Sequence, residues 1–144
     1  MYGPYANYTR EELLEALDGV TDISTEVANQ IRCGEIKINV LGDELFDASC
    51  PLECVGTSAY FKEGQIYVRR NSTSLLSDLV HEGKHALDYN NFIAQTTYQA
   101  EFSAYKAEQS FQIEKNFPVD FTNDDEILVH IYTNYQNGEF YIPE

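Results

Sequence analysis

Two histidines four residues apart, with a glutamate directly after the first, form the pattern in this sequence that predicts specific chemistry. The pattern is His81-Glu82-Gly83-Lys84-His85, and the 144 residues contain three histidines in all. On an α-helix, residues four apart lie on one face, so His81 and His85 can bind the same metal ion. Glu82 can reach a water molecule near that ion without being a ligand. This HExxH spacing is typical of zinc peptidases.

The residues around the motif predict the helix that this geometry needs. Between positions 74 and 88, leucine, valine and alanine recur every three or four residues, as in a helix with one buried face. Capping residues at 71–74 precede it. Two β-prone runs, 59–62 and 65–69, are joined by a glycine-bearing turn and predict a hairpin just before this helix. An exposed hairpin edge can pair with an extended substrate backbone and lay the scissile bond across the metal.

A catalytic zinc ion usually has three protein ligands and leaves a fourth position to water. The candidates for the third ligand are Glu101, Glu108, Asp88 and His130. A short connection implies that helix 96–114 runs antiparallel to the motif helix. At a rise of about 1.5 Å per residue, Glu101 is level with the histidines, whereas Glu108 overshoots by roughly 10 Å. We therefore expect Glu101 to be the ligand and Asp88 to accept a hydrogen bond from a ligand imidazole.

Peptide hydrolysis passes through a tetrahedral oxyanion, which needs a hydrogen-bond donor besides the metal. Tyr105, four residues beyond Glu101, and His130 are the candidates. His130 lies among apolar residues of a predicted helix, which fits a core histidine better than a catalytic one. Because the chain has eleven tyrosines, the sequence alone does not select one of them.

The length of 144 residues fits one domain, 1–144, with a core of its own. We expect an α+β fold in which a short antiparallel hairpin packs against the HExxH helix and a second, ligand-bearing helix. Helices, a strand and a loop occupy 1–58, the hairpin and the two metal-site helices occupy 59–114, and a helix and tail occupy 115–144. The expected elements outside the motif are a helix from Thr9 to about Gly19, a helix capped by Asp22 or Ser24 and ending at Gly34, a strand at 36–40, a loop at 42–58, a helix from Thr96 to Glu114, a helix from Thr122 to Asn137 and an edge strand at 140–144.

The chain is strongly acidic, with 24 acidic against 9 basic residues and a net charge of −15. Such a surface repels phosphates, so we expect neither nucleic acid nor anionic lipid as a partner. No apolar run reaches the length of a membrane span. The first residues lack the pattern of a signal peptide. We therefore expect a cytoplasmic protein, or one that another module or a secretion machine delivers to a target cell.

The chain contains three cysteines, Cys33, Cys50 and Cys54. An odd number without a signal peptide favours free thiols. A second metal pair or a local disulfide between Cys50 and Cys54 are the alternatives, and we expect incidental or buried thiols.

The motif and the downstream segment Glu101-Phe102-Ser103-Ala104-Tyr105 resemble the gluzincin class of zinc metallopeptidases. The compact size resembles the minimal metallopeptidase domains of bacterial polymorphic and secreted toxins. The resemblance covers residues 59–114 and implies Zn²⁺ bound by His81, His85 and the glutamate of the segment. It further implies Glu82 as the catalytic residue, a peptide or protein substrate and, for a toxin, a cognate inhibitor protein.

Three other functions remain open at this point. A regulatory protease with one protein target has the same chemistry. A binding protein with a structural zinc site would normally lack the glutamate after the first histidine, and Glu82 is present. An acidic mimic of nucleic acid would bind a basic partner without zinc.

Overall fold

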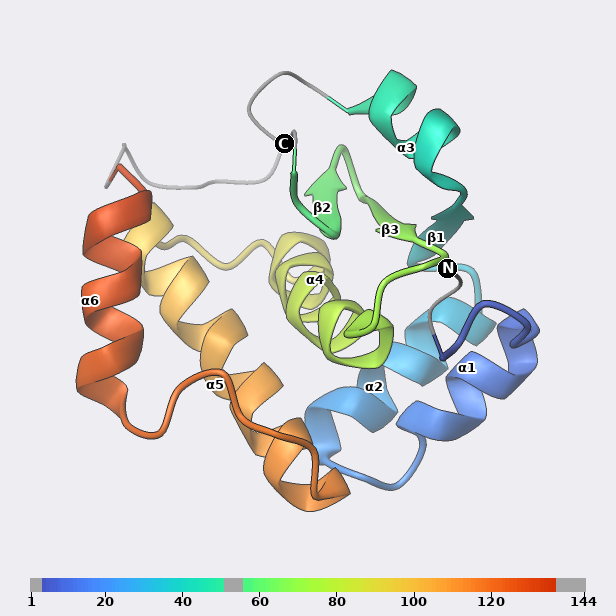
Figure 1. Cartoon of the computed structure of the whole chain (residues 1–144). Helices are drawn as coiled ribbons and strands as arrows, with labels where there is room; N and C mark the ends of the chain where they lie inside the picture. The colour runs from blue at the N-terminus through green and yellow to red at the C-terminus, as the bar shows by residue number, and fades with distance from the viewer. Residues whose placement is uncertain (1–3, 51–55, 137–144) are drawn as a thin grey trace.

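The computed structural model in Figure 1 describes residues 4–50 and 56–136. These residues form six α-helices and one three-stranded sheet, which confirms the expected α+β class. The elements are α1 (Arg10–Leu17), α2 (Asp22–Arg32), β1 (Lys37–Leu41), α3 (Asp43–Ser49), β2 (Ala59–Lys62), β3 (Gln65–Arg69), α4 (Leu75–Asn90), α5 (Thr97–Lys115) and α6 (Asp124–Asn134).

The predicted hairpin is confirmed and forms part of a mixed sheet. Strands β2 and β3 pair antiparallel, with Ala59 opposite Val68. Their two turn residues, Glu63 and Gly64, have φ angles of 51° and 82°, which suit a two-residue hairpin turn. Strand β1 pairs with β3 in parallel, so the strand order is β1-β3-β2. Among the described residues, strand β2 therefore lies at an edge of the sheet.

Helix α4, which contains the HExxH motif, lies at the centre of the molecule (Figure 1). It contacts α1, α2, α5 and both strands of the hairpin. Its apolar face joins the inward side of β3 and the first two helices in a single core, whose central members include Leu14, Val27, Ile31, Ile66, Val68, Leu75, Leu79 and Val80. The motif is therefore anchored from several directions.

Gly83, inside the motif, lets α2 approach α4 very closely. A Cβ atom at this position would lie 2.6 Å from both Cγ atoms of Val27. The valine is β-branched and has little freedom to move within its own helix. Because Gly83 has no side chain, the motif helix can pack directly against α2.

The expected loop at 42–58 was partly wrong, because Asp43–Ser49 forms helix α3. This helix has one fully buried side chain, Phe46, too few for a visible apolar period. Tertiary contacts with β3 stabilise it: the Arg69 guanidinium lies 4.2 Å from the centre of the Phe46 ring and pairs with Asp43 and Asp47.

Two helix ends also differ from the expectation. Thr21, not Asp22 or Ser24, caps α2, because its hydroxyl accepts from Ser24 N–H while Ser24 Oγ accepts from Thr21 N–H. Helix α6 begins after the cap Asn123 and ends at Asn134, three residues earlier than expected. The proposed edge strand at 140–144 lies outside the described residues.

The cysteines differ from one another. Cys33 is a free thiol, as expected, but it is exposed rather than buried. Cys50 is disulfide-bonded, so the expectation of a free thiol was wrong at this position. Cys54 lies outside the described residues.

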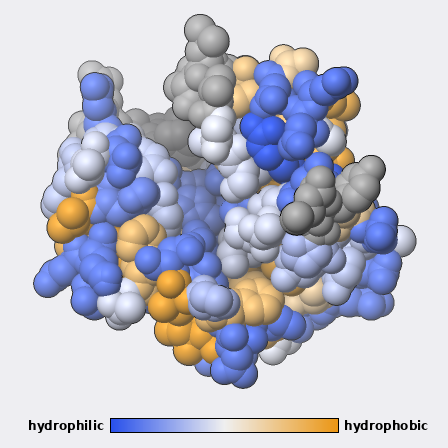
Figure 2. All heavy atoms as spheres, viewed as in Figure 1, coloured by the Kyte–Doolittle hydropathy of each residue, from blue (hydrophilic) through white to orange (hydrophobic). Residues whose placement is uncertain are grey.

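Hydrophilic residues cover most of the face shown in Figure 2, in keeping with the acidic composition. Within residues 4–50 and 56–136, no helix combines the length and apolar character needed to span a membrane.

Candidate metal centre

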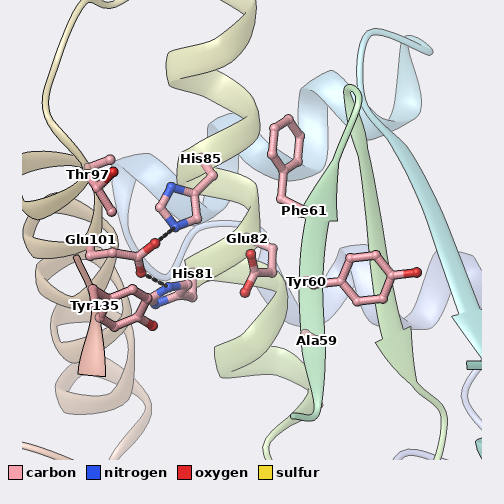
Figure 3. Close-up of a pocket in the computed structure, with 10 residues that line it drawn as sticks. Ala59, Tyr60, Phe61, His81, Glu82, His85, Thr97, Glu101 and Tyr135 are labelled. Carbon is pink, nitrogen blue, oxygen red and sulfur yellow. Dashed lines mark hydrogen bonds and ion pairs between the residues drawn. The ribbon is translucent and has the colours of Figure 1, made fainter. Parts of the chain in front are cut away.

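The motif side chains open into a cleft between the sheet edge and α5 (Figure 3). The cleft has a volume of about 340 Å³. Strand β2 forms one wall, α5 forms the other, and the motif face of α4 lies between them. The residues that line it are Ala59, Tyr60, Phe61, His81, Glu82, His85, Thr97, Ala100, Glu101 and Tyr135.

Glu101 faces both motif histidines from α5. One carboxylate oxygen, Oε1, lies 3.1 Å from His81 Nε2, and the other, Oε2, lies 3.1 Å from His85 Nε2. The capping box of Thr96 and Gln99 sets the start of α5, and hence the turn on which Glu101 lies. The structure thus places the predicted third ligand beside the two predicted histidine ligands.

Glu82 lies on the other side of the histidine pair, toward β2 (Figure 3). Potential ligand atoms of His81, Glu82 and His85 all lie within 4.8 Å of one another. Burial raises the pKa of the Glu82 carboxyl, although the adjacent imidazoles oppose this effect. A carboxylate with a raised pKa is a better proton acceptor near neutral pH. Its position and environment therefore suit a general base.

Glu108, which we expected to lie too far along α5, also contacts the motif. Its Oε1 lies 2.9 Å from His81 Nδ1, on the opposite side of the ring from Glu101. Glu101 and Glu108 are seven residues apart on the same face of α5. A single imidazole spans this gap because its two nitrogens point in different directions. Helix rise alone gives the histidine a single position and ignores the separate positions of its two nitrogens, so this contact was missed.

Asp88 does not take the supporting role that we expected, and this prediction was wrong. Its carboxylate accepts hydrogen bonds from Lys84 Nζ at 2.7 Å and from Gln95 Nε2 at 3.0 Å. Lys84 lies four residues earlier on the same helix face and forms an ion pair with the carboxylate. Asp88 therefore ties the end of α4 to the segment before α5, and Glu108 supports the histidine instead.

The carboxylates determine the protonation of His81. Burial alone would lower its pKa, but hydrogen bonds with Glu101 and Glu108 raise the pKa well above its ordinary value. Burial opposes ionisation of Glu101, yet the adjacent charges of His85 and His81 hold the pKa of this carboxyl far below its usual range. With a carboxylate on each ring nitrogen, His81 carries two protons in this arrangement. A metal ion must displace the proton on Nε2.

A buried polar network lies behind Glu108. Gln112 Nε2 lies 3.4 Å from Glu108 Oε2, 3.3 Å from Ser77 Oγ and 3.2 Å from Asp120 Oδ2. Burial raises the pKa of Glu108 to about 7, although its bond to His81 acts in the opposite direction. These contacts fix the carboxylate that orients His81.

The two expected oxyanion donors, Tyr105 and His130, are not among the described residues that line the cleft. The Tyr105 ring packs against the His81 ring, with centroids 4.4 Å apart. Its hydroxyl lies 3.0 Å from His130 Nε2 and 3.0 Å from the hydroxyl of Tyr135. Tyr135 itself borders the cleft.

Sequence reasoning missed Tyr135 as a site residue, since it follows the final turn of α6 and belongs to no motif. Burial and the nearby charge of Glu101 raise its pKa, so the phenol keeps its proton at neutral pH. It is therefore a hydrogen-bond donor at the cleft, with the Glu101 carboxylate as an acceptor.

No family model matches the chain, and comparisons with curated proteins and with solved structures found no match either. The resemblance to gluzincins thus stays a prediction.

Proposed function

We propose that this chain is a zinc-dependent metallopeptidase in which His81, His85 and Glu101 bind Zn²⁺. The observation that carries the proposal is the position of Glu101, whose two oxygens each lie 3.1 Å from the Nε2 atom of one motif histidine. Two imidazoles and one carboxylate form a ligand set typical of catalytic zinc. The cleft beside these groups gives a substrate access to them.

The supporting contacts fit this ligand set. Metal-binding histidines usually donate their other ring N–H to a carboxylate or carbonyl, which fixes the orientation of the ring. Glu108 accepts in this way from His81 Nδ1 at 2.9 Å, so that Nε2 faces Glu101. Glu82 is the other nearby carboxylate, and its place on the β2 side of the histidines favours contact with substrate.

The proposed mechanism assigns each cleft group a task. Bound zinc supplies Lewis acidity, which polarises a carbonyl group and makes a water molecule more acidic. Glu82 takes a proton from the attacking water and passes it to the leaving amine as the C–N bond breaks. Tyr135 donates a hydrogen bond to the oxyanion. Strand β2, at the sheet edge, pairs with the extended backbone of the substrate.

Peptide-bond cleavage tests this proposal. Zinc-loaded wild-type protein and the Glu82→Gln variant are each incubated with a mixture of unfolded proteins, and new N-termini are identified by mass spectrometry. We expect new termini from wild type alone, and their loss when a chelator is added. Cleavage by Glu82→Gln at the wild-type rate would show that Glu82 is not the general base. No cleavage by zinc-loaded wild type would contradict the peptidase assignment.

We further propose that the peptidase acts as a bacterial toxin outside the cytoplasm of its source cell. The support is the resemblance to minimal toxin domains and the disulfide at Cys50, because disulfides persist mainly in oxidising compartments. Expression in bacteria, directed to the cytoplasm or to the periplasm, tests this. Growth arrest by periplasmic wild type but not by Glu82→Gln is expected, and normal growth in both compartments would contradict it.

A further inference from the structure

Four polar side chains form a continuous hydrogen-bonded chain that ends at the cleft. Asn134 Nδ2 lies 3.2 Å from His130 Nδ1, and His130 Nε2 lies 3.0 Å from the Tyr105 hydroxyl. That hydroxyl lies 3.0 Å from the hydroxyl of Tyr135, which lines the cleft. Phe121 packs against the rings of both Tyr105 and His130, with centroids 5.4 and 5.2 Å apart. This hydrogen-bonded chain thus runs from the exposed C-terminal end of α6 to the proposed active site.

The orientation of the Asn134 amide sets the direction of this chain. Asn134 Nδ2 also lies 2.9 Å from the backbone carbonyl oxygen of His130. A carbonyl oxygen only accepts hydrogen bonds, so the asparagine must present its NH₂ group here and not its oxygen. The same NH₂ group has a second hydrogen to donate and lies 3.2 Å from His130 Nδ1. This nitrogen therefore accepts, and in the neutral ring the proton lies on Nε2.

The proton on His130 Nε2 determines the direction of the remaining hydrogen bonds. His130 Nε2–H donates to the Tyr105 oxygen, so the Tyr105 hydroxyl uses its single hydrogen to donate to the Tyr135 oxygen. The Tyr135 hydroxyl then donates into the cleft, where the Glu101 carboxylate is one acceptor for it. The reverse direction would place a proton on His130 Nδ1, facing the donor group of Asn134. Rotating the amide would instead bring two acceptor oxygens together at about 2.9 Å.

We propose that His130 and Asn134 are positioning residues, which act through Tyr105 to hold the Tyr135 hydroxyl as a hydrogen-bond donor toward the cleft. The catalytic consequence rests on the proposed peptidase function, in which Tyr135 contacts the oxyanion. The direction of the chain itself does not depend on that function. An experiment that contradicts the peptidase function therefore leaves the direction of the hydrogen bonds untouched, and the direction can be contradicted on its own.

The tautomer of His130 tests the direction without any substrate. Long-range ¹H–¹⁵N correlation spectra of ¹⁵N-labelled full chain distinguish a protonated from an unprotonated ring nitrogen, and loss of one histidine pattern in His130→Gln assigns the residue. With the ring titrated to its neutral form, we expect a protonated Nε2 and an unprotonated Nδ1. A ring protonated on Nδ1, or an equal mixture of tautomers, would overturn the proposal.

Variants test whether the direction matters for the reaction. His130→Phe removes the donor to Tyr105, whereas His130→Gln keeps an N–H group in a side chain of similar length. We expect His130→Phe to lower kcat by about tenfold with little change in KM, and His130→Gln to restore most of the loss. Asn134→Ala should mix the His130 tautomers, with its exposed neighbour in Thr133→Ala as the control. Equal kcat for the Phe and Gln variants would overturn the positioning role.

Discussion

Glu108 Oε1 lies 2.9 Å from His81 Nδ1, so a buried carboxylate holds this histidine from the side opposite the cleft. The two residues are 27 positions apart and come from adjacent helices. Their contact explains how one ring in the HExxH motif is fixed before any metal binds.

The first prediction follows from this contact. Glu108→Ala leaves His81 Nδ1 without its acceptor, and we expect zinc affinity to fall by about 10- to 100-fold. Zinc dissociation constants from competition with a chromophoric chelator measure the effect. Glu114→Ala, which removes an exposed carboxylate from the same helix, should bind zinc like wild type. Unchanged affinity in Glu108→Ala would show that the carboxylate does not support the metal site.

The second prediction concerns pH. The folded-state pKa of His81 is raised above its ordinary value, so its charged form stabilises the metal-free fold below about pH 6.5. This contribution is lost as pH rises through the folded-state pKa. The raised pKa of Glu108, about 7, acts in the same direction, because the folded state also binds that proton more tightly.

Zinc must displace the Nε2 proton of His81, so its affinity should increase as pH rises. We therefore expect the Tm of chelator-treated protein to fall between about pH 6 and 9 while the added stabilisation by zinc grows. Thermal unfolding with and without zinc across this range measures both trends. Zinc stabilisation that is independent of pH would contradict the protonation that we assign to His81.

The third prediction concerns the close approach of α2 to the motif helix. Gly83→Ala places a methyl group against Val27, and we expect a loss of about 1–3 kcal/mol in the free energy of unfolding. Chemical denaturation measures the loss. In the Gly83→Ala/Val27→Ala double variant the clash is relieved, so its destabilisation should be smaller than the sum of the two single losses. If the two losses in the free energy of unfolding simply add, the side chains at the two positions do not clash.

The fourth prediction concerns the Tyr135 hydroxyl. Removing one oxyanion donor typically costs about 100- to 1,000-fold in kcat, and we expect Tyr135→Phe to fall in this range while it retains zinc. Tyr132→Phe, which removes a hydroxyl from an exposed tyrosine of α6, is the control and should cleave like wild type. A Tyr135→Phe variant with normal kcat would exclude Tyr135 as the oxyanion donor.

The parts of the fold that the sequence predicted well are those set by local signals. The capping boxes at Thr9 and Thr96 located two helix starts, and the glycine-bearing turn located the hairpin. Because α5 starts where its capping box indicates, the helix rise placed Glu101 level with the histidines. The position of Glu101 relative to the HExxH motif could therefore be predicted from helix geometry.

The missed features depend on tertiary packing. Helix α3 is stabilised by Arg69 on a distant strand, and nothing within its own seven residues reveals that contact. Glu108 was set aside as a ligand on the helix rise, and its contact with His81 Nδ1 was missed because the direction of each imidazole nitrogen is not visible in a sequence. Tyr135 reaches the cleft because α6 packs against α5 and brings the residue after its last turn to the site.

Zinc binding by three proteins tests the central claim most directly. Equilibrium titration with metal analysis is carried out on wild type, Glu101→Gln and Glu82→Gln, all prepared free of metal. We expect one zinc per chain in wild type and Glu82→Gln, and a loss of affinity of at least about tenfold in Glu101→Gln. If wild type binds no zinc, or if Glu82→Gln loses the metal while Glu101→Gln keeps it, the proposed centre is wrong.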